Sequence, residues 1–260
     1  MSPNPKLHRR EVWDQFWRQN QRIEQVYSNS DRVLSQLRNL GAMERKKILE
    51  VGAGSGRDGV ALCADGAVVI MLDYSDPALR VIQSLAIPNQ HPVHLIRGDA
   101  FRLPLKTNSI DVVFHQGLLE HFTNPRSILA ENHRVLRTGG YALADVPQRY
   151  HVYTAIKHVL MMLNKWFAGW ETEFSVGQLK VLFRQAGFSV DHVYGDWMRP
   201  SLFYRALRQM LKTLHQHLPL YPKPLPGVTK LRSLVRRKIR RSSLAFYTYM
   251  DIGVIGKKTC

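Results

Sequence analysis

Residues 46–76 read KKILEVGAGSGRDGVALCADGAVVIMLDYSD, and this stretch decides the fold. It opens with a short apolar run, Lys46–Val51, that predicts a strand, and a glycine-rich turn at 52–56 follows at once. We expect a helix from the turn to about Ala64 and a second strand over Ala67–Leu72. A strand, a glycine turn and a helix in this order bring backbone N–H groups and a helix N-terminus onto a ligand. The stretch therefore predicts the start of a ligand-binding α/β fold.

The same alternation of apolar strands and helices continues beyond this stretch. We expect further strands at Val93–Arg97, Ile110–His115, Tyr141–Val146, Phe188–Tyr194 and, at the end of the chain, Ala245–Ile255. We expect helices at Pro77–Leu85, at Pro125–Leu136 with a stop at Thr138-Gly139-Gly140, and at Ser175–Ala186. Continuous apolar strands separated by helices indicate a parallel sheet that is covered on both faces.

Two long insertions interrupt the later part of the chain. Residues 148–174 form an aromatic and basic stretch that exceeds an ordinary crossover connection, and residues 198–243 contain 12 of the 37 Lys and Arg residues. Each insertion follows a strand, so each starts at the carboxyl edge of the sheet, where ligands bind in such folds. We therefore expect both insertions to cover the substrate. Upstream, Glu11–Leu40 predicts two helices with a break around Ser28–Asp31.

Charge is distributed unevenly along the chain. There are 37 Lys and Arg residues against 20 Asp and Glu, a formal charge of +17, yet residues 199–260 hold 14 of the basic residues and one acid, Asp251. Such a segment usually faces an anionic partner, and a merely solvated surface is the alternative. Within it, Val228–Arg241 predicts an amphipathic helix with Leu231, Leu234, Val235 and Ile239 on one face. This helix suits either an anionic membrane surface or docking on the body with its charges toward phosphate.

Composition excludes several classes of protein. Two cysteines, Cys63 and Cys260, cannot build a disulfide framework or a zinc cluster, and this usage fits a reducing cytosol. No apolar run approaches the ~20 residues that span a bilayer, and the N-terminus lacks the apolar centre of a signal peptide. His215 and His217 have no accompanying ligand pattern, so we expect no metal site.

Three acids lie at the ends of the first three predicted strands. Glu50 precedes the glycines, Asp73 ends the second strand, and Asp99 follows the third in Gly98-Asp99-Ala100. A carboxylate at the end of the second strand can accept both hydroxyl protons of a ribose. One after the third strand can accept from an adenine amino group, while the next backbone N–H binds a ring nitrogen. The acids therefore indicate a nucleoside ligand.

Five motifs in this order resemble the class I S-adenosylmethionine-dependent methyltransferases. They are ILEVGAGSGRDG (48–59), VIMLDYSD (69–76), GDAFRLP (98–104), IDVVFHQGLLEHF (110–122) and VLRTGGYALADVP (135–147). The match covers about residues 45–195 and is most similar to the small-molecule branch of ubiquinone/menaquinone biosynthesis methyltransferases. The resemblance implies a Rossmann-like three-layer α/β sandwich. Its seven-stranded, mostly parallel sheet would have the order 3-2-1-4-5-7-6, with strand seven antiparallel and helical insertions over the active site.

The resemblance also implies a domain organisation and a set of cofactor contacts. Residues 45–260 would form the methyltransferase domain, and the helices of residues 1–44 would cap its cofactor side. S-adenosylmethionine would leave as S-adenosyl-L-homocysteine. The implied contacts are Gly52, Gly54 and Gly56 around the methionine part, Glu50 near its amino group, Arg57 at its carboxylate, Asp73 on the ribose, Tyr74 beside the adenine, Asp99 and Ala100 at the adenine edge, and Gln116 near the sulfonium.

Methyl transfer from a sulfonium is a direct displacement, so alignment supplies much of the barrier reduction. A general base is needed only where the acceptor must lose a proton. Our candidates are His121 first, because an imidazole has the right ordinary pKa, then Glu120 and Asp145. His115, His151 and Tyr153 are further candidates, and His121 could equally pack or cap the helix that follows it.

The sequence favours a cytoplasmic methyltransferase that acts on a small-molecule or lipid-like acceptor, with residues 228–241 placed for peripheral contact with an anionic membrane. The alternative is an RNA methyltransferase that uses the basic insertion as its platform. The (N/D)-P-P-(Y/F/W) signature of amino-group DNA and RNA methyltransferases is absent after the fourth strand, where HQGLLEH stands. A nucleotide-dependent dehydrogenase is disfavoured by Gly98-Asp99-Ala100 and by Glu50, and a cofactor-binding protein without catalysis stays open.

Overall fold

The computed structural model describes residues 8–20, 31–87, 92–163, 166, 171–224 and 226–259. Within them one sheet has the strand order β3-β2-β1-β4-β5-β7-β6. The strands are β1 (Lys47–Val51), β2 (Val68–Asp73), β3 (Val93–Arg97), β4 (Ile110–Gln116), β5 (Leu136–Pro147), β6 (Phe188–Asp196) and β7 (Asp251–Lys258). Only β7 runs antiparallel to its neighbours β5 and β6. The predicted fold and strand order are therefore confirmed.

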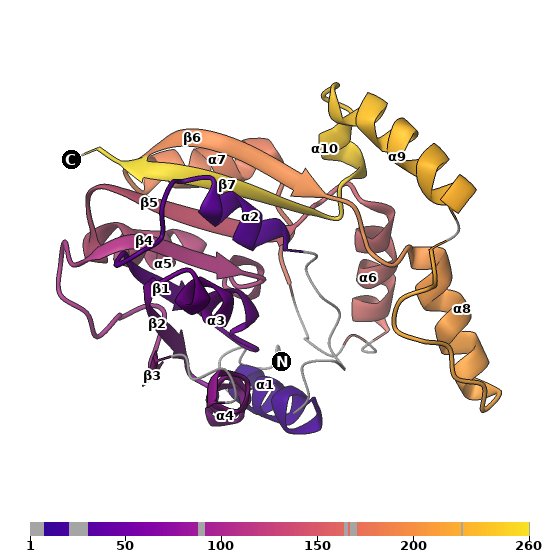
Figure 1. Cartoon of the computed structure of the whole chain (residues 1–260), viewed down its shortest axis with the longest axis horizontal. Coiled ribbons are helices and arrows are strands. Elements are labelled where there is room, and N and C mark those ends of the chain that lie inside the picture. The colour runs from indigo at the N-terminus through magenta and orange to yellow at the C-terminus, as the bar shows by residue number, and fades with distance from the viewer. Residues whose placement is uncertain are drawn as a thin grey trace.

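Helices cover both faces of this sheet (Figure 1). One apolar cluster joins the sheet to α2 (Arg32–Arg38), α3 (Arg57–Ala64) and α4 (Asp76–Ala86). A second joins the other face to α5 (Pro125–Val135) and α7 (Val176–Gln185). In β1, Ile48 belongs to the first cluster and its neighbour Leu49 to the second. Because successive strand residues point to opposite faces, a strand between two helical layers is mostly apolar on both faces, as Ile48, Leu49 and Val51 of β1 are.

Two predicted boundaries are wrong, and local packing gives the reason. Helix α5 ends at Val135 and β5 begins at Leu136, so the glycines at 139 and 140 lie inside the strand. A side-chain carbon at Gly140 would lie 2.8 Å from the Asp111 carbonyl oxygen, so a close backbone approach explains this glycine. The last strand begins at Asp251, because residues 245–248 form a short helix, α10 (Ala245–Thr248).

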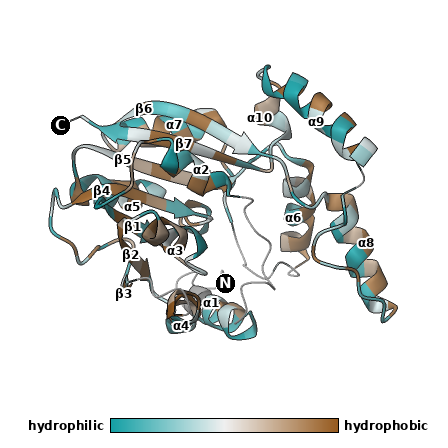
Figure 2. Cartoon of the chain, in the orientation of Figure 1, coloured by the Kyte–Doolittle hydropathy of each residue, from teal (hydrophilic) through white to brown (hydrophobic). Residues whose placement is uncertain are grey.

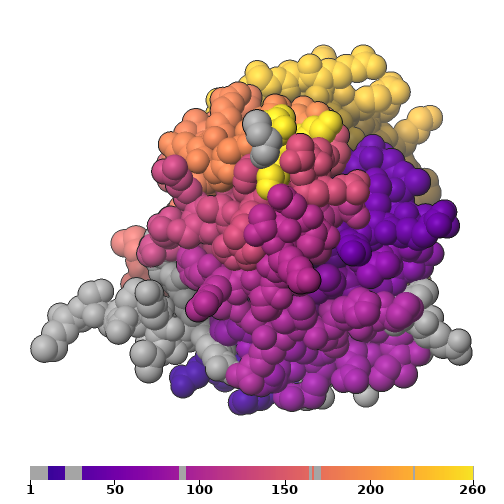
Figure 3. Space-filling model, turned by 90° about the vertical axis from the view of Figure 1, so that its left-hand side faces the viewer, coloured from indigo at the N-terminus to yellow at the C-terminus, as the bar shows by residue number. Residues whose placement is uncertain are grey.

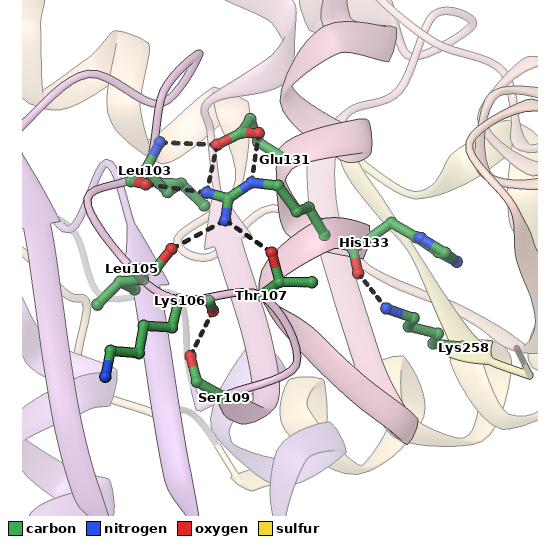
Figure 4. A network of polar contacts seen from close by, with 9 residues as sticks. Leu103, Leu105, Lys106, Thr107, Ser109, Glu131, His133 and Lys258 are labelled. Carbon is green, nitrogen blue, oxygen red and sulfur yellow. Dashed lines mark hydrogen bonds and ion pairs between the residues drawn. The ribbon is translucent and has the colours of Figure 1, made fainter.

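Long polar side chains hold the loop after β3 against α5 (Figure 4). The Arg134 guanidinium pairs with Glu131 and donates to the carbonyl oxygens of Leu103 and Leu105, each at 2.9 Å. The same ion pair lowers the pKa of Glu131. Nearby, Nζ of Lys258 donates to the His133 carbonyl oxygen at 2.8 Å. The Arg134 contacts fix the loop after β3 against α5, and the Lys258 contact connects β7 to the end of that helix.

The remaining helices lie at the two ends of the sheet's carboxyl edge (Figure 1). Helix α1 (His8–Gln19) packs against α4, while α6 (Val152–Met162), α8 (Leu202–Thr213) and α9 (Pro226–Arg240) lie beyond β5 and β6. The predicted helix at 228–241 corresponds to α9, and the predicted break before α2 lies mostly outside the described residues. Figure 3 shows the molecule from the left-hand side of Figure 1, away from α6, α8 and α9. On this side the segments up to β5 and the orange α7–β6 region cover the surface. No helix in the described ranges is long and apolar enough to cross a membrane.

Candidate functional site

A cavity of 910 Å³ lies at the carboxyl ends of β1 to β4. Its size falls within the ~300–1,000 Å³ usual for small-molecule and cofactor sites. Nine of the ten predicted cofactor residues line it: Glu50, Gly52, Gly54, Arg57, Asp73, Tyr74, Asp99, Ala100 and Gln116. The structure thus brings together residues that are spread over 67 positions of the sequence.

The glycine turn has the left-handed backbone that glycine favours. Gly52, Gly54 and Gly56 have φ angles of 64°, 53° and 62°. Gly56 does not line the cavity: a side-chain carbon there would lie 2.7 Å from Ile82 Cγ1, so its lack of a side chain serves helix packing. At Gly54 such a carbon would lie 2.7 Å from Cζ2 of Trp17. The turn therefore forms a cradle that any larger residue would fill.

Asp73 braces this cradle from the end of β2. Its Oδ2 accepts a hydrogen bond from the Gly54 N–H and its Oδ1 accepts one from the Ser75 N–H, both at 2.9 Å. Burial raises the pKa of Asp73, and these backbone hydrogen bonds oppose the rise. Each carboxylate oxygen has a second lone pair, so the side chain keeps acceptor capacity for a ligand hydroxyl.

Burial shifts the pKa of Glu50, the acid near the end of β1, more strongly than that of Asp73. Glu50 is buried below the glycine turn, and burial together with the nearby Asp58 raises its pKa well above the usual value. Asp99 instead lies at an exposed turn, where its Oδ1 accepts from the Phe101 N–H at 2.9 Å. Phe101 and Phe122 meet edge to face beside it, with ring centroids 5.0 Å apart. The cavity therefore has one polar end and one aromatic end.

Helix α1 supplies an aromatic wall made of Trp13, Phe16 and Trp17. Trp17 also packs against Ala78 and Val81 of α4, so the stripe is both core and cavity wall. The hydroxyl of Ser75 donates to Asp14 Oδ1 at 2.6 Å and ties α1 to the start of α4. Whether α1 acts as a lid stays a prediction.

A second, smaller cavity of 220 Å³ adjoins the first, and Gln116 and Gly117 line both. The three predicted catalytic candidates are divided between them. His121 lines the larger cavity, whereas Glu120 and Asp145 line the smaller one. Burial, reinforced by the charge of Glu171, raises the pKa of Glu120 well above its usual value.

Asp145 is held by Arg32, a residue that no motif in the sequence marks. Nε and Nη2 of Arg32 donate to its two carboxylate oxygens at 2.9 and 2.6 Å, and Nη1 lies 3.0 Å from Asp251. Burial raises the pKa of Asp251 to about 6, and Arg32 opposes this rise. Both oxygens of Asp145 are therefore occupied by one guanidinium, which favours a structural role over proton transfer.

Two of the other candidate bases, His115 and His151, have structural roles. His115 is 1% exposed and, among the described residues, lines neither cavity. Its burial lowers its pKa to about 3. His151 caps α6, where its Nδ1 accepts a hydrogen bond from the Tyr153 N–H at 3.1 Å. Packing and helix capping therefore account for these two side chains.

His121 has a polar network behind it that sequence reasoning missed. Its Nδ1 lies 3.9 Å from Oε1 of Glu171, and its ring meets Trp13 edge to face at 5.0 Å. Glu171 is paired at 2.6 Å with Lys157, a buried residue of α6 that also contacts Glu173 at 2.8 Å. Burial lowers the pKa of Lys157, but the two carboxylates outweigh it and raise the pKa overall. No group of three His, Cys, Asp or Glu residues in the described part of the chain could hold a metal ion.

These features define an α/β protein with a cavity at the carboxyl edge of its sheet, the place where such folds bind nucleoside cofactors. Residues 49–144 match the family model described as a methyltransferase domain. A Mycolicibacterium smegmatis protein named as a probable S-adenosylmethionine-dependent methyltransferase is 32% identical over 152 residues, which cover 58% of this chain and 54% of that protein. The ubiquinone biosynthesis O-methyltransferase of Nitrosomonas europaea is 26% identical over 168 residues, covering 62% and 71%.

A solved structure has the same fold along almost the whole chain. A Haloferax volcanii chain in complex with the Trm112 methyltransferase activator has a TM-score of 0.64 and 17% identity, covering 97% of this chain and 98% of that one. The chain spans about half the length of the Mycolicibacterium smegmatis relative. With the sheet order, these matches show that residues 49–144 are similar to a methyltransferase domain and that the chain has the same fold as the Haloferax volcanii chain.

Proposed function

We propose that the chain transfers the methyl group of S-adenosylmethionine to a small-molecule or lipid-like acceptor by direct displacement. The observation that carries this proposal is the pair of cavities that meet at Gln116 and Gly117. The larger cavity would hold S-adenosylmethionine, and the smaller cavity would hold the acceptor. A cytoplasmic location, peripheral at a membrane surface, is part of the proposal.

The residues around the larger cavity fit the cofactor, which supplies an activated methyl group when it is bound. Asp73 would hold the two ribose hydroxyls, because its carboxylate lines the cavity at the end of β2. The remaining contacts would come from Tyr74, Asp99 and Ala100 at the adenine, Gly52, Gly54, Glu50 and Arg57 at the methionine part, and Gln116 beside the sulfur.

His121 is the residue best placed to accept a proton from the acceptor. It lines the larger cavity near the residues shared with the smaller one, and Glu171 stands behind its Nδ1. A carboxylate behind an imidazole orients the ring and stabilises its protonated form. Glu171 would thus be a positioning residue, and Lys157 would hold Glu171 in place.

The first test follows the methyl group. With methyl-labelled S-adenosylmethionine and a cell extract, we expect the label in a small compound that partitions into organic solvent. Each fraction is separated by size and treated with ribonuclease. Label that remains in RNA-sized material and disappears on ribonuclease treatment would overturn the small-molecule acceptor and support the RNA alternative.

A second test concerns His121. His121→Asn should lower kcat by about a hundredfold, the lower end of what a general base contributes, with little change in cofactor affinity. The acid limb of the pH–rate profile should also disappear, since the imidazole must be neutral to accept a proton. Glu171→Gln should give a smaller loss that retains this limb. A His121→Asn variant with unchanged kcat and pH profile would contradict the assignment.

A further inference from the structure

Large apolar side chains gather on the helices beyond the carboxyl edge of the sheet. Among the described residues, sixteen of the twenty exposed large apolar side chains lie between Tyr150 and Leu163 or between Phe203 and Tyr247. They include Met162, Phe203 and Leu231, which are 83%, 78% and 65% exposed. Figure 2 shows hydrophobic positions along α6, α8 and α9 at this end of the molecule. Single exposed apolar residues are ordinary, whereas a cluster marks an interaction site.

Helices α8 and α9 are basic, and none of α6, α8 and α9 contains an acid. Helix α8 reads LFYRALRQMLKT and α9 reads PGVTKLRSLVRRKIR. The exposed basic side chains on α9 include Lys230, Arg232 and Arg237. The single acid of residues 199–260, Asp251, is already held by Arg32 at 3.0 Å. This end of the molecule therefore presents apolar and positively charged groups together.

Helix α9 uses only one end of its apolar stripe for packing. Near its C-terminus, Ile239 packs against the core, and the guanidinium groups of Arg236 and Arg240 lie 4.9 and 5.4 Å from the ring centroid of Trp197. Towards its N-terminus, the side chains of Leu231 and Val235 are exposed. The helix is thus anchored at one end and leaves an apolar stripe in water at the other.

We propose that α6, α8 and α9 form a docking face for the surface of an anionic phospholipid bilayer. The exposed apolar side chains enter the acyl boundary, while the Lys and Arg side chains contact the headgroups. A basic polar face beside an exposed apolar face is the pattern of helices that lie in the membrane interface. Phosphate contacts on a nucleic acid need the basic groups but not the exposed aliphatic stripe.

The docking face adjoins the smaller cavity. Arg205 of α8 lines that cavity together with Met198 and Arg199, which precede the helix. A lipid-like acceptor held in the bilayer would therefore approach the site beside α8. This last step rests on the proposed methyl transfer to a lipid-like acceptor, whereas the docking face rests on the exposed side chains alone.

The test is flotation of the full chain with vesicles of two compositions. Binding is expected to vesicles made of equal amounts of phosphatidylcholine and phosphatidylglycerol, and not to phosphatidylcholine alone. Arg232→Gln with Arg237→Gln should weaken binding by about fivefold per charge. Leu231→Ser with Leu234→Ser should weaken it by about tenfold, and this loss should persist at high salt because burial of apolar surface is not screened. The matched control is Val181→Ser with Arg184→Gln on the exposed face of α7, which should bind as wild type does.

Binding of S-adenosylhomocysteine, measured by calorimetry on the same proteins, shows whether each variant is folded. Absence of S-adenosylhomocysteine binding by the wild type would refute the proposed methyl transfer without affecting the flotation result. Failure of the wild type to float, equal binding to both vesicle types, or unchanged binding by both α9 variants would overturn the docking face. A gel shift with RNA that the arginine variant weakens, in the absence of flotation, would assign the basic surface to nucleic acid instead.

Discussion

Asp73→Ala should bind S-adenosylhomocysteine roughly a thousandfold more weakly than the wild type. Hydrogen bonds to a charged group contribute about 1.5–3 kcal/mol each, and the proposed contacts use two ribose hydroxyls. The change also removes the acceptor for the Gly54 N–H, which lies 2.9 Å from Oδ2 in the glycine cradle. Isothermal titration calorimetry measures the difference directly.

A neighbouring acid gives the matched control for this experiment. Asp76 lies three residues further on, is partly exposed and pairs with Arg97 at 3.1 Å. Asp76→Ala should bind the cofactor as the wild type does. Asp73→Asn keeps one acceptor oxygen and should show a smaller loss, which separates the lost charge from a disturbed turn. Affinity of Asp73→Ala within about threefold of the wild type would refute the ribose assignment, since one such hydrogen bond alone exceeds that factor.

The second large effect concerns stability. Arg32→Met should reduce the free energy of unfolding by about 3–5 kcal/mol, because it leaves two carboxylates without their shared cation in a buried site. Arg32 connects α2 to the ends of β5 and β7 through Asp145 and Asp251. Urea unfolding followed by circular dichroism measures the loss.

Helix α2 itself provides the control. Arg38 pairs with Asp65 at 2.7 Å on the surface, and Arg38→Met should cost no more than about 1 kcal/mol. Equal losses for the two variants would contradict the proposed importance of burial.

The loss in Arg32→Met should depend on pH. Burial raises the pKa of Asp251 to about 6 in the native state, against about 3.8 for an unfolded aspartate. The stability that comes from its protonated form is complete below the unfolded value and is lost as the pH rises through the native value. Removing Arg32 raises the pKa of Asp251 further, so the pH range over which this stability is lost moves upward. The stability deficit of Arg32→Met should therefore be larger at about pH 8 than at about pH 5. A deficit that grows toward acid would show that these carboxylates are not the cause.

The arrangement of the sheet and most of the cofactor side could be predicted from the sequence because their signals are local. A buried parallel strand is mostly apolar on both faces, as Ile48, Leu49 and Val51 are, and a tight turn at a ligand needs the glycines at 52 and 54. The glycine at 56 has the same local signal, yet Ile82, which is distant in sequence, gives it a packing role. Local patterns also misplaced the start of the last strand, because Ala245–Thr248 is as apolar as a strand and forms a helix instead.

The acceptor side depended on tertiary contacts that leave no local pattern. Arg32 meets Asp145 across 113 positions of the chain, and Lys157 meets Glu171 from within an insertion that looks merely aromatic and basic. The charge of the C-terminal quarter was evident from composition, but only the fold shows that its apolar stripes stay in water beside the smaller cavity. Backbone conformation and strand burial are properties of neighbouring residues, so the sequence by itself determined the sheet and the cofactor cradle. Charge pairing and exposure depend on which distant segments meet, so only the tertiary structure decided the partners of Asp145 and His121 and the face presented by α6, α8 and α9.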